Sequence, residues 1–85
     1  MAHSWNVEDD LAALYVSLHG AASNALTLDT LAARRGIDPD SFRMRVGNFK
    51  HLAGAGGLSN ASKQSREVFE IYGRLPEHHL RKLVE

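Results

Sequence analysis

The chain has 85 residues, 44% of them hydrophobic and 24% charged, which predicts one small folded domain and excludes a disordered chain. Ten basic and ten acidic residues give a formal net charge of zero, which excludes the overall basic excess typical of strong DNA-binding domains. There is no cysteine and no apolar run near the roughly 20 residues of a membrane-spanning helix, so disulfides, thiolate metal sites and transmembrane segments are excluded and a cytoplasmic protein is expected.

The first predicted helix covers Val7 to about Leu18. Asn6 is its expected N-cap, with Asp9 three residues later as part of a capping box, and the acidic first turn suits the positive end of the helix dipole. Trp5, just before the cap, is expected to fold back onto the core. The buried stripe of this helix is expected to consist of Leu11, Leu14, Tyr15 and Leu18.

Two helices joined by a short turn are predicted in the middle of the chain. The first runs from about Leu28 to Arg35 with Thr27 as its cap, and Gly36 ends it in the left-handed conformation that glycine adopts without strain. Asp38 is the expected cap of the second, which starts at Pro39 and continues to about Ala53. The apolar face of this second helix is expected to consist of Phe42, Val46, Phe49 and Ala53.

Two short helices are predicted after a glycine-rich corner at positions 54–57. Ser62 is the expected cap of the first, Lys63–Tyr72, and Pro76 opens the second. The side chains expected to face the core are Val68, Phe69 and Tyr72 in the first and Leu80, Leu83 and Val84 in the second. Strand-like alternation of useful length is absent, so the sequence predicts an all-α fold, a compact bundle of about five short helices in one domain over residues 1–85.

The two central helices have the layout of a helix-turn-helix, a unit that offers its second helix to the major groove of DNA. Ala32 is small where the two helices cross, and Gly36 lies four residues later in the turn. Ile37 follows as an apolar plug, and Phe42 anchors the second helix to the core. Two-helix corners with glycine turns also occur in proteins that do not bind DNA, so both interpretations stay open.

The outer face of the helix that starts at Pro39 carries residue types that read DNA bases. At 100° per residue this face lies opposite the apolar one. Arginine can bind guanine through two hydrogen bonds, asparagine can do the same for adenine, and methionine can contact the methyl group of thymine or methylcytosine. The candidate base-contacting residues are Arg43, Met44, Gly47, Asn48 and His51. The alternative is a solvated polar face with one methionine and a tolerated glycine.

Basic residues concentrate in the centre of the chain, where DNA phosphates are expected to bind. Between Arg34 and Arg66, seven basic residues against two acidic ones give a local charge of +5. Lys63 and Arg66 lie in the first turn of a helix, whose unpaired N–H groups favour an anion. The candidate phosphate-contacting residues are Arg45, Lys50, Ser59, Asn60, Ser62, Lys63 and Arg66. Ordinary surface cations are the alternative.

Catalytic and metal-binding patterns are weak in this sequence. His78 and His79 are adjacent, so they point to different faces of a helix and cannot chelate one metal ion. The acidic pairs Asp9/Asp10 and Asp38/Asp40 are explained by helix starts. We therefore expect no enzymatic activity within these residues, no metal, no cofactor and no small-molecule substrate.

Several segments form an ordered pattern that covers most of the chain. They are Trp5 with Glu8–Asp9, Ala13–Tyr15, Ser41–Arg45 leading to Gly47–Phe49, Gly57–Lys63 and Phe69–Tyr72. This pattern resembles the N-terminal helical region that precedes the catalytic domain in bacterial HNH-type restriction endonucleases, including the modification-dependent McrA-like enzymes. The resemblance implies a helical DNA-binding head, one that senses modified bases, upstream of a ββα-metal nuclease. The chain has no H-N-H segment, so cleavage activity is not carried over, and neither is the identity of the modification.

The sequence therefore predicts a double-stranded DNA-binding domain that senses modified bases and acts as the recognition head of an HNH restriction endonuclease. The expected partner is duplex DNA, methylated or unmodified, and no membrane partner is expected. The alternatives that stay open are a protein-interaction, adaptor or dimerisation module, including a homodimer, and a small helix-turn-helix regulator.

Overall fold

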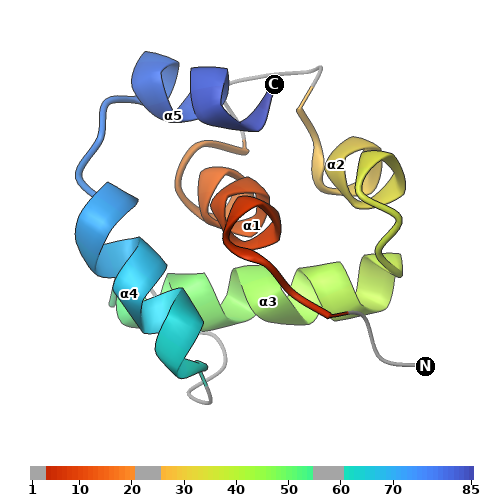
Figure 1. Cartoon of the computed structure of the whole chain (residues 1–85), viewed down its shortest axis with the longest axis horizontal. Helices are drawn as coiled ribbons and strands as arrows, with labels where there is room; N and C mark the ends of the chain where they lie inside the picture. The colour runs from red at the N-terminus through yellow and green to blue at the C-terminus, as the bar shows by residue number, and fades with distance from the viewer. Residues whose placement is uncertain (1–3, 21–25, 55–60) are drawn as a thin grey trace.

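Five helices form the part of the chain that this computed structural model describes, residues 4–20, 26–54 and 61–85. In chain order they are α1 Val7–His19, α2 Leu28–Arg34, α3 Pro39–Leu52, α4 Lys63–Tyr72 and α5 Glu77–Val84 (Figure 1). No strand occurs within the described ranges, which confirms the predicted all-α fold. The helix boundaries also agree closely with the prediction, because most of them follow from local caps and glycines.

The helix α1 lies at the centre of the bundle, and the other four helices are arranged around it (Figure 1). Its residues Asp9–Tyr15 are all buried, so this helix has no solvent face over about two turns. The sequence predicted a single buried stripe instead. The difference arises because Ala12 and Ala13 are small, which lets neighbouring helices approach α1 from the sides that the stripe leaves open.

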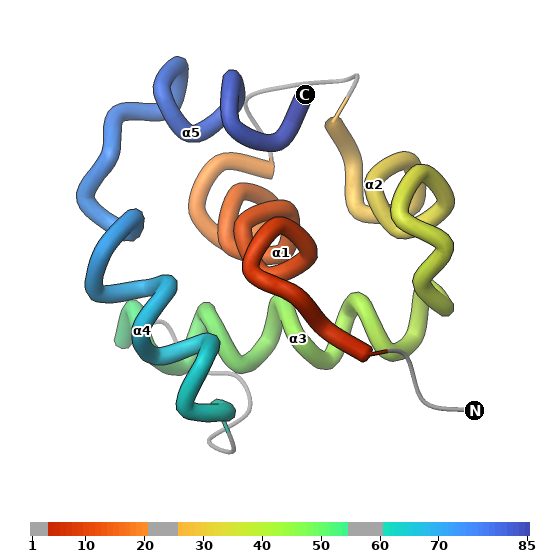
Figure 2. Tube along the Cα trace, in the orientation of Figure 1, coloured from red at the N-terminus to blue at the C-terminus, as the bar shows by residue number. Residues whose placement is uncertain are grey.

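The apolar core fills the space between α1 and the surrounding helices. From α3 it receives the predicted Phe42, Val46 and Phe49, all buried, whereas Ala53, expected on the same face, is exposed at the C-cap of the helix. The segment before α1 runs from that helix toward α3 (Figure 2), and the Trp5 and Phe42 ring centroids lie 6.0 Å apart, which confirms that the segment folds back onto the core. The prediction that Leu83 faces the core is wrong, since 51% of its surface is exposed. The inward face of α5 is defined by the pair Leu80 and Val84, one turn apart, and Leu83 lies beside that line.

Side chains cap most of the helix starts as the sequence predicted. The Asp9 N–H donates to Asn6 Oδ1 at 2.8 Å and the Asn6 N–H donates to Asp9 Oδ2 at 3.1 Å, so the capping box of α1 is complete. Thr27, Asp38 and Ser62 cap α2, α3 and α4 by accepting hydrogen bonds from backbone N–H groups. Each such cap contributes about 1 kcal/mol to stability.

A tight turn at residues 35–38 joins α2 to α3. Gly36 has a φ of +67°, the left-handed conformation that disfavours residues with a β-carbon, as predicted. The Ile37 N–H donates to the Ala32 carbonyl oxygen at 2.8 Å, and the Ile37 side chain is buried. In Figure 1, α2 is seen nearly end-on while α3 lies across the view, so the two helices cross steeply. Two helices with a glycine turn are thus present, and the use of this pair as a DNA-binding unit stays a prediction.

Candidate nucleic-acid interface

The outer face of α3 is open to solvent. Arg43, Met44 and His51 are exposed, and the other two candidate base-contacting residues, Gly47 and Asn48, are half-buried. Met44 is 59% exposed, which places a large apolar side chain in water. In Figure 1 the helix forms the lower edge of the molecule, with α1 above it and α4 beside its C-terminal half. The predicted exposure is therefore confirmed for Arg43, Met44 and His51, while Gly47 and Asn48 are partly covered.

One weak ion pair lies on the outer face of α3. The Arg43 Nη1 donates to Asp40 Oδ1 at 2.8 Å, and the two side chains are 62% and 85% exposed. Exposed pairs of this kind contribute less than about 1 kcal/mol, so Arg43 can leave Asp40 at low cost. Lys50, also on this helix, is exposed and has no carboxylate within 4 Å among the described residues.

Two further cations, Lys63 and Arg66, lie in the exposed first turn of α4. Neither has a carboxylate within 4 Å in the part of the chain that the structure describes. Ser62 serves as the cap of this helix, since its hydroxyl accepts from the Ser65 N–H and donates to Ser65 Oγ, both at 3.1 Å. The remaining candidates from this region, Ser59 and Asn60, lie outside the described residues.

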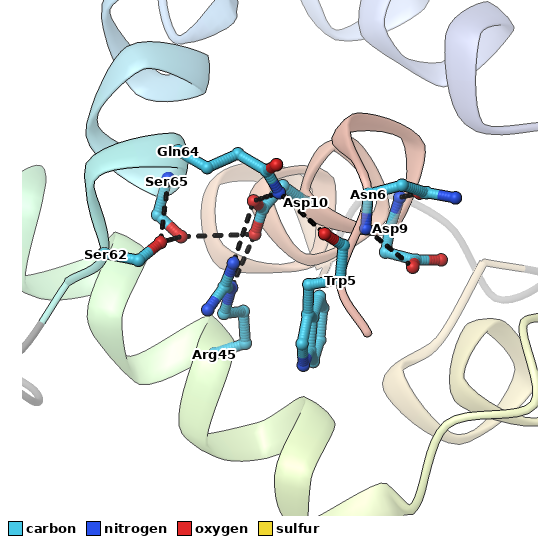
Figure 3. Close-up of polar contacts among 8 residues, drawn as sticks. All are labelled: Trp5, Asn6, Asp9, Asp10, Arg45, Ser62, Gln64 and Ser65. Atoms are coloured by element: carbon cyan, nitrogen blue, oxygen red, sulfur yellow. Dashed lines mark hydrogen bonds and ion pairs between the residues drawn. The ribbon is translucent and has the colours of Figure 1, made fainter. Parts of the chain in front are cut away.

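Arg45 occupies a buried ion pair instead of the surface. Its Nε and Nη2 donate to Oδ1 and Oδ2 of Asp10 at 2.6 and 3.0 Å (Figure 3), and its side chain is only 15% exposed. The guanidinium carbon lies 4.6 Å from the centroid of the Trp5 ring, within the range of a cation–π contact. Because this ion pair holds the guanidinium on the inner side of α3, we do not propose the phosphate contact predicted for Arg45.

Asp10 is the centre of a buried polar cluster that joins three helices. We define the Asp10 cluster as Trp5, Asp10, Arg45, Gln64 and Ser65 (Figure 3). Besides Arg45, the fully buried carboxylate accepts from Gln64 Nε2 at 2.6 Å and from Ser65 Oγ at 3.2 Å. A carboxylate accepts about four hydrogen bonds, and all four are present here. The sequence explained this aspartate by the helix start, yet its spacing from Leu14, one turn later, places it on the buried side of α1.

A second buried carboxylate connects α1 to α2. Asp9 is 2% exposed, and its Oδ1 accepts a hydrogen bond from Arg35 Nε. The exposed Glu8 carboxylate lies 3.7 Å from Arg35 Nη2. Two of the seven basic residues in the central block, Arg35 and Arg45, are therefore neutralised by α1. The exposed cations of this block that lack a carboxylate within 4 Å among the described residues are Arg34, Lys50, Lys63 and Arg66.

Other polar groups do not converge into a catalytic arrangement in the described ranges. A surface hollow of about 340 Å³ lies at the C-terminal end of α4, lined by Phe69, Glu70, Gly73 and Arg74. Its charged residues, one acid and one base, lie at its exposed rim. Across residues 4–20, 26–54 and 61–85, His, Asp and Glu side chains form no group of three or more that could hold a metal ion.

Comparison with protein-family models, with curated proteins and with solved structures finds no match for this chain. The resemblance to the N-terminal region of HNH-type restriction endonucleases therefore stays a prediction. The longest described helix, α3, has 14 residues, and none of the described helices has the length and apolar character needed to cross a bilayer.

Proposed function

We propose that the chain is a double-stranded DNA-binding domain that places the outer face of α3 in the major groove. The observation that carries this proposal is that α3 follows α2 across a glycine turn and exposes Arg43, Met44 and His51, while the opposite face of the same helix packs on α1. A helix of 14 residues is about 21 Å long, and the major groove is wide enough to admit it. Gly47, midway along this face, has no β-carbon to hold a DNA backbone away.

Base recognition in this proposal falls to side chains in the middle of α3. Arg43 leaves Asp40 and binds guanine O6 and N7. A bidentate contact of this kind favours the correct base by about 1–3 kcal/mol, whereas the exposed ion pair with Asp40 contributes less. Asn48 binds adenine N6 and N7, with His51 one turn along the helix. Met44 offers an apolar contact to the methyl group of thymine or of a methylated cytosine, which extends the proposal to modified bases.

Phosphate binding falls to Lys50, Lys63 and Arg66, the exposed cations on α3 and at the start of α4. Neutralising three phosphates gives a slope of about −2.7 for log K against log salt concentration. Raising the salt from about 50 to about 200 mM therefore weakens binding roughly 40-fold. This slope is modest because Arg35 and Arg45 are engaged by Asp9 and Asp10.

In its wider setting, the proposed role is that of the recognition head of an HNH restriction endonuclease in the cytoplasm of a bacterium. The support for this extension is the ordered resemblance of the segments around Trp5, Met44 and Lys63 to such heads. In that arrangement the cleavage chemistry belongs to a separate domain, and this chain supplies the recognition of the target site.

The proposal is tested by titrating the chain with duplexes that differ only in cytosine and adenine methylation, at about 50 and about 200 mM salt. We expect Asn48→Ala to reduce the preference among duplexes by about 1–3 kcal/mol and Lys63→Ala to weaken binding to all duplexes alike. The matched control is Lys82→Ala, an exposed lysine on α5, which lies across the molecule from α3 (Figure 1). Absence of salt-dependent binding to every duplex contradicts the proposal.

A second candidate function is a dimerisation module that uses the same face of α3. The observation that favours it is the exposed Met44, 59% accessible, one turn from the small Gly47, because a small residue lets two helices approach closely. Sedimentation distinguishes the two functions. A dimer that dissociates in Met44→Glu supports this candidate, and a strict monomer excludes it.

A further inference from the structure

We propose that Asp10 is a positioning residue for the DNA interface, acting through Gln64 and Ser65 to hold the first turn of α4 beside α3. Its carboxylate thereby sets where Lys63 and Arg66 meet the DNA backbone. This inference rests on the DNA-binding function proposed above and specifies how one part of that site is assembled.

The geometry of the carboxylate supports this role. Asp10 Oδ1 accepts from Arg45 Nε at 2.6 Å and from Ser65 Oγ at 3.2 Å, and Oδ2 accepts from Arg45 Nη2 at 3.0 Å and from Gln64 Nε2 at 2.6 Å. Each oxygen thus bonds to one group on α3 and to one group on α4 (Figure 3). A single fully buried residue on α1 therefore fixes the distance between the two helices that carry the proposed contacts.

The first turn of α4 has little apolar packing of its own. Its buried residue is Ser65, and the first buried apolar side chain, Val68, comes almost one turn later. Gln64 Nε2 also donates to the Trp5 carbonyl oxygen at 3.3 Å, which ties the same turn to the segment before α1. The placement of this turn therefore depends on hydrogen bonds to the Asp10 cluster, and Lys63 and Arg66 flank the two residues that make those bonds.

The role requires a carboxylate specifically, because all four partners are donors. An asparagine amide at position 10 presents N–H groups toward the N–H groups of Arg45 and Gln64, so at least one of these side chains must move away. Gln64→Met removes the shorter of the two hydrogen bonds from α4 to Asp10, at 2.6 Å, and the bond to the Trp5 carbonyl oxygen, while leaving the ion pair between Asp10 and Arg45 intact. This second variant keeps the main buried charge pair satisfied, so a folded protein is expected.

The test measures the salt slope of duplex binding for Asp10→Asn and Gln64→Met against the wild-type chain and a Lys63→Ala/Arg66→Ala double variant. In the double variant we expect the slope of log K against log salt concentration to become less negative by about 1.8. In each single-site variant we expect it to become less negative by at least about 0.9, with an unchanged preference among duplexes. Asp29→Asn is the matched control, since it removes the same negative charge from an exposed position on α2. Far-UV circular dichroism verifies that each variant is folded.

Two results separate the failure of this inference from the failure of the proposed function. A folded Gln64→Met variant that keeps the full wild-type slope overturns the positioning role and leaves DNA binding in place. A purely structural role of the cluster gives this same result, with a lower melting temperature and an unaltered slope. A wild-type chain that binds no duplex overturns both.

Discussion

Replacing Arg45 by methionine tests whether the Asp10 cluster is a dry, structural ion pair. Methionine retains an apolar chain against Trp5 but leaves the carboxylate of Asp10, which is 0% exposed, without a cation. Removing one partner of a buried ion pair costs about 3–5 kcal/mol. A domain of this size has a total stability of about 5–15 kcal/mol, and each kcal/mol shifts its melting temperature by about 4–8 °C. We therefore expect Arg45→Met to lower the melting temperature by roughly 12 °C or more.

The assay for this variant is urea unfolding, followed both by fluorescence and by far-UV circular dichroism. Trp5 is the only tryptophan of the chain and contacts Arg45, so its emission reports on the cluster while circular dichroism reports on the helices. Lys50→Met, at an exposed position of the same helix, is the control and is expected to change stability by less than about 0.5 kcal/mol. The double variant Asp10→Asn/Arg45→Met should be more stable than the sum of the single losses predicts. A loss below about 1 kcal/mol for Arg45→Met refutes the reasoning, because it means that water reaches Asp10.

Three further substitutions test the turn, a cap and the contact between the first and last helices. Gly36→Ala should cost about 1–2 kcal/mol in urea unfolding, because alanine is strained at a φ of +67°; an unchanged midpoint would show that the turn adapts. Thr27→Ala removes the cap of α2 and should lower the free energy of unfolding by about 1 kcal/mol in the same assay. An unchanged free energy of unfolding would show that water replaces the hydroxyl. Tyr15→Phe removes a 2.6 Å hydrogen bond to Glu77 Oε2, so a loss of about 1.5–3 kcal/mol and faster amide hydrogen exchange in α5 are expected. Exchange in α5 at the wild-type rate would contradict this last expectation.

Helix positions were predictable from the sequence because the signals that set them are local. The capping box of Asn6 with Asp9, the left-handed Gly36 and the cap at Asp38 each act within a few residues, and the structure has all of them. The exposed face of α3 was predictable for a similar reason, since the periodicity of Phe42, Val46 and Phe49 determines which side of the helix is buried.

The partners of the charged residues were not predictable in the same way. Arg43 and Arg45 are two residues apart on α3, and the sequence predicted DNA contacts for both, Arg43 with bases and Arg45 with phosphates. Their environments differ because α1 brings the Asp10 carboxylate to one side of α3, and 35 residues separate Asp10 from Arg45 in the chain. The local charge of +5 counted between Arg34 and Arg66 therefore overestimated the positive charge at the surface. The one signal for the ion pair between Asp10 and Arg45 was the position of Asp10 on the buried side of α1.

The segments on which the predicted resemblance to restriction endonuclease heads rests contain buried residues as well as exposed ones. Trp5 and Arg45 belong to the Asp10 cluster, and Phe49 belongs to the core. Met44, in the same segment as Arg45, is exposed, as is Lys63 at the start of α4. If the predicted resemblance holds, its buried positions concern the packing of the helices, and only its exposed positions concern DNA contacts.

The central position of α1 has a consequence for the order in which the molecule can assemble during synthesis. This helix precedes the four helices that enclose it, and its Tyr15 bonds to a residue 62 positions later in the chain. During synthesis, α1 is therefore made before the helices that cover it, and the part of its apolar surface that packs against α5 stays uncovered until α5 has been made. We therefore expect a chain that ends before α5 to be cleaved by proteases faster than the full chain, because part of its interior is exposed.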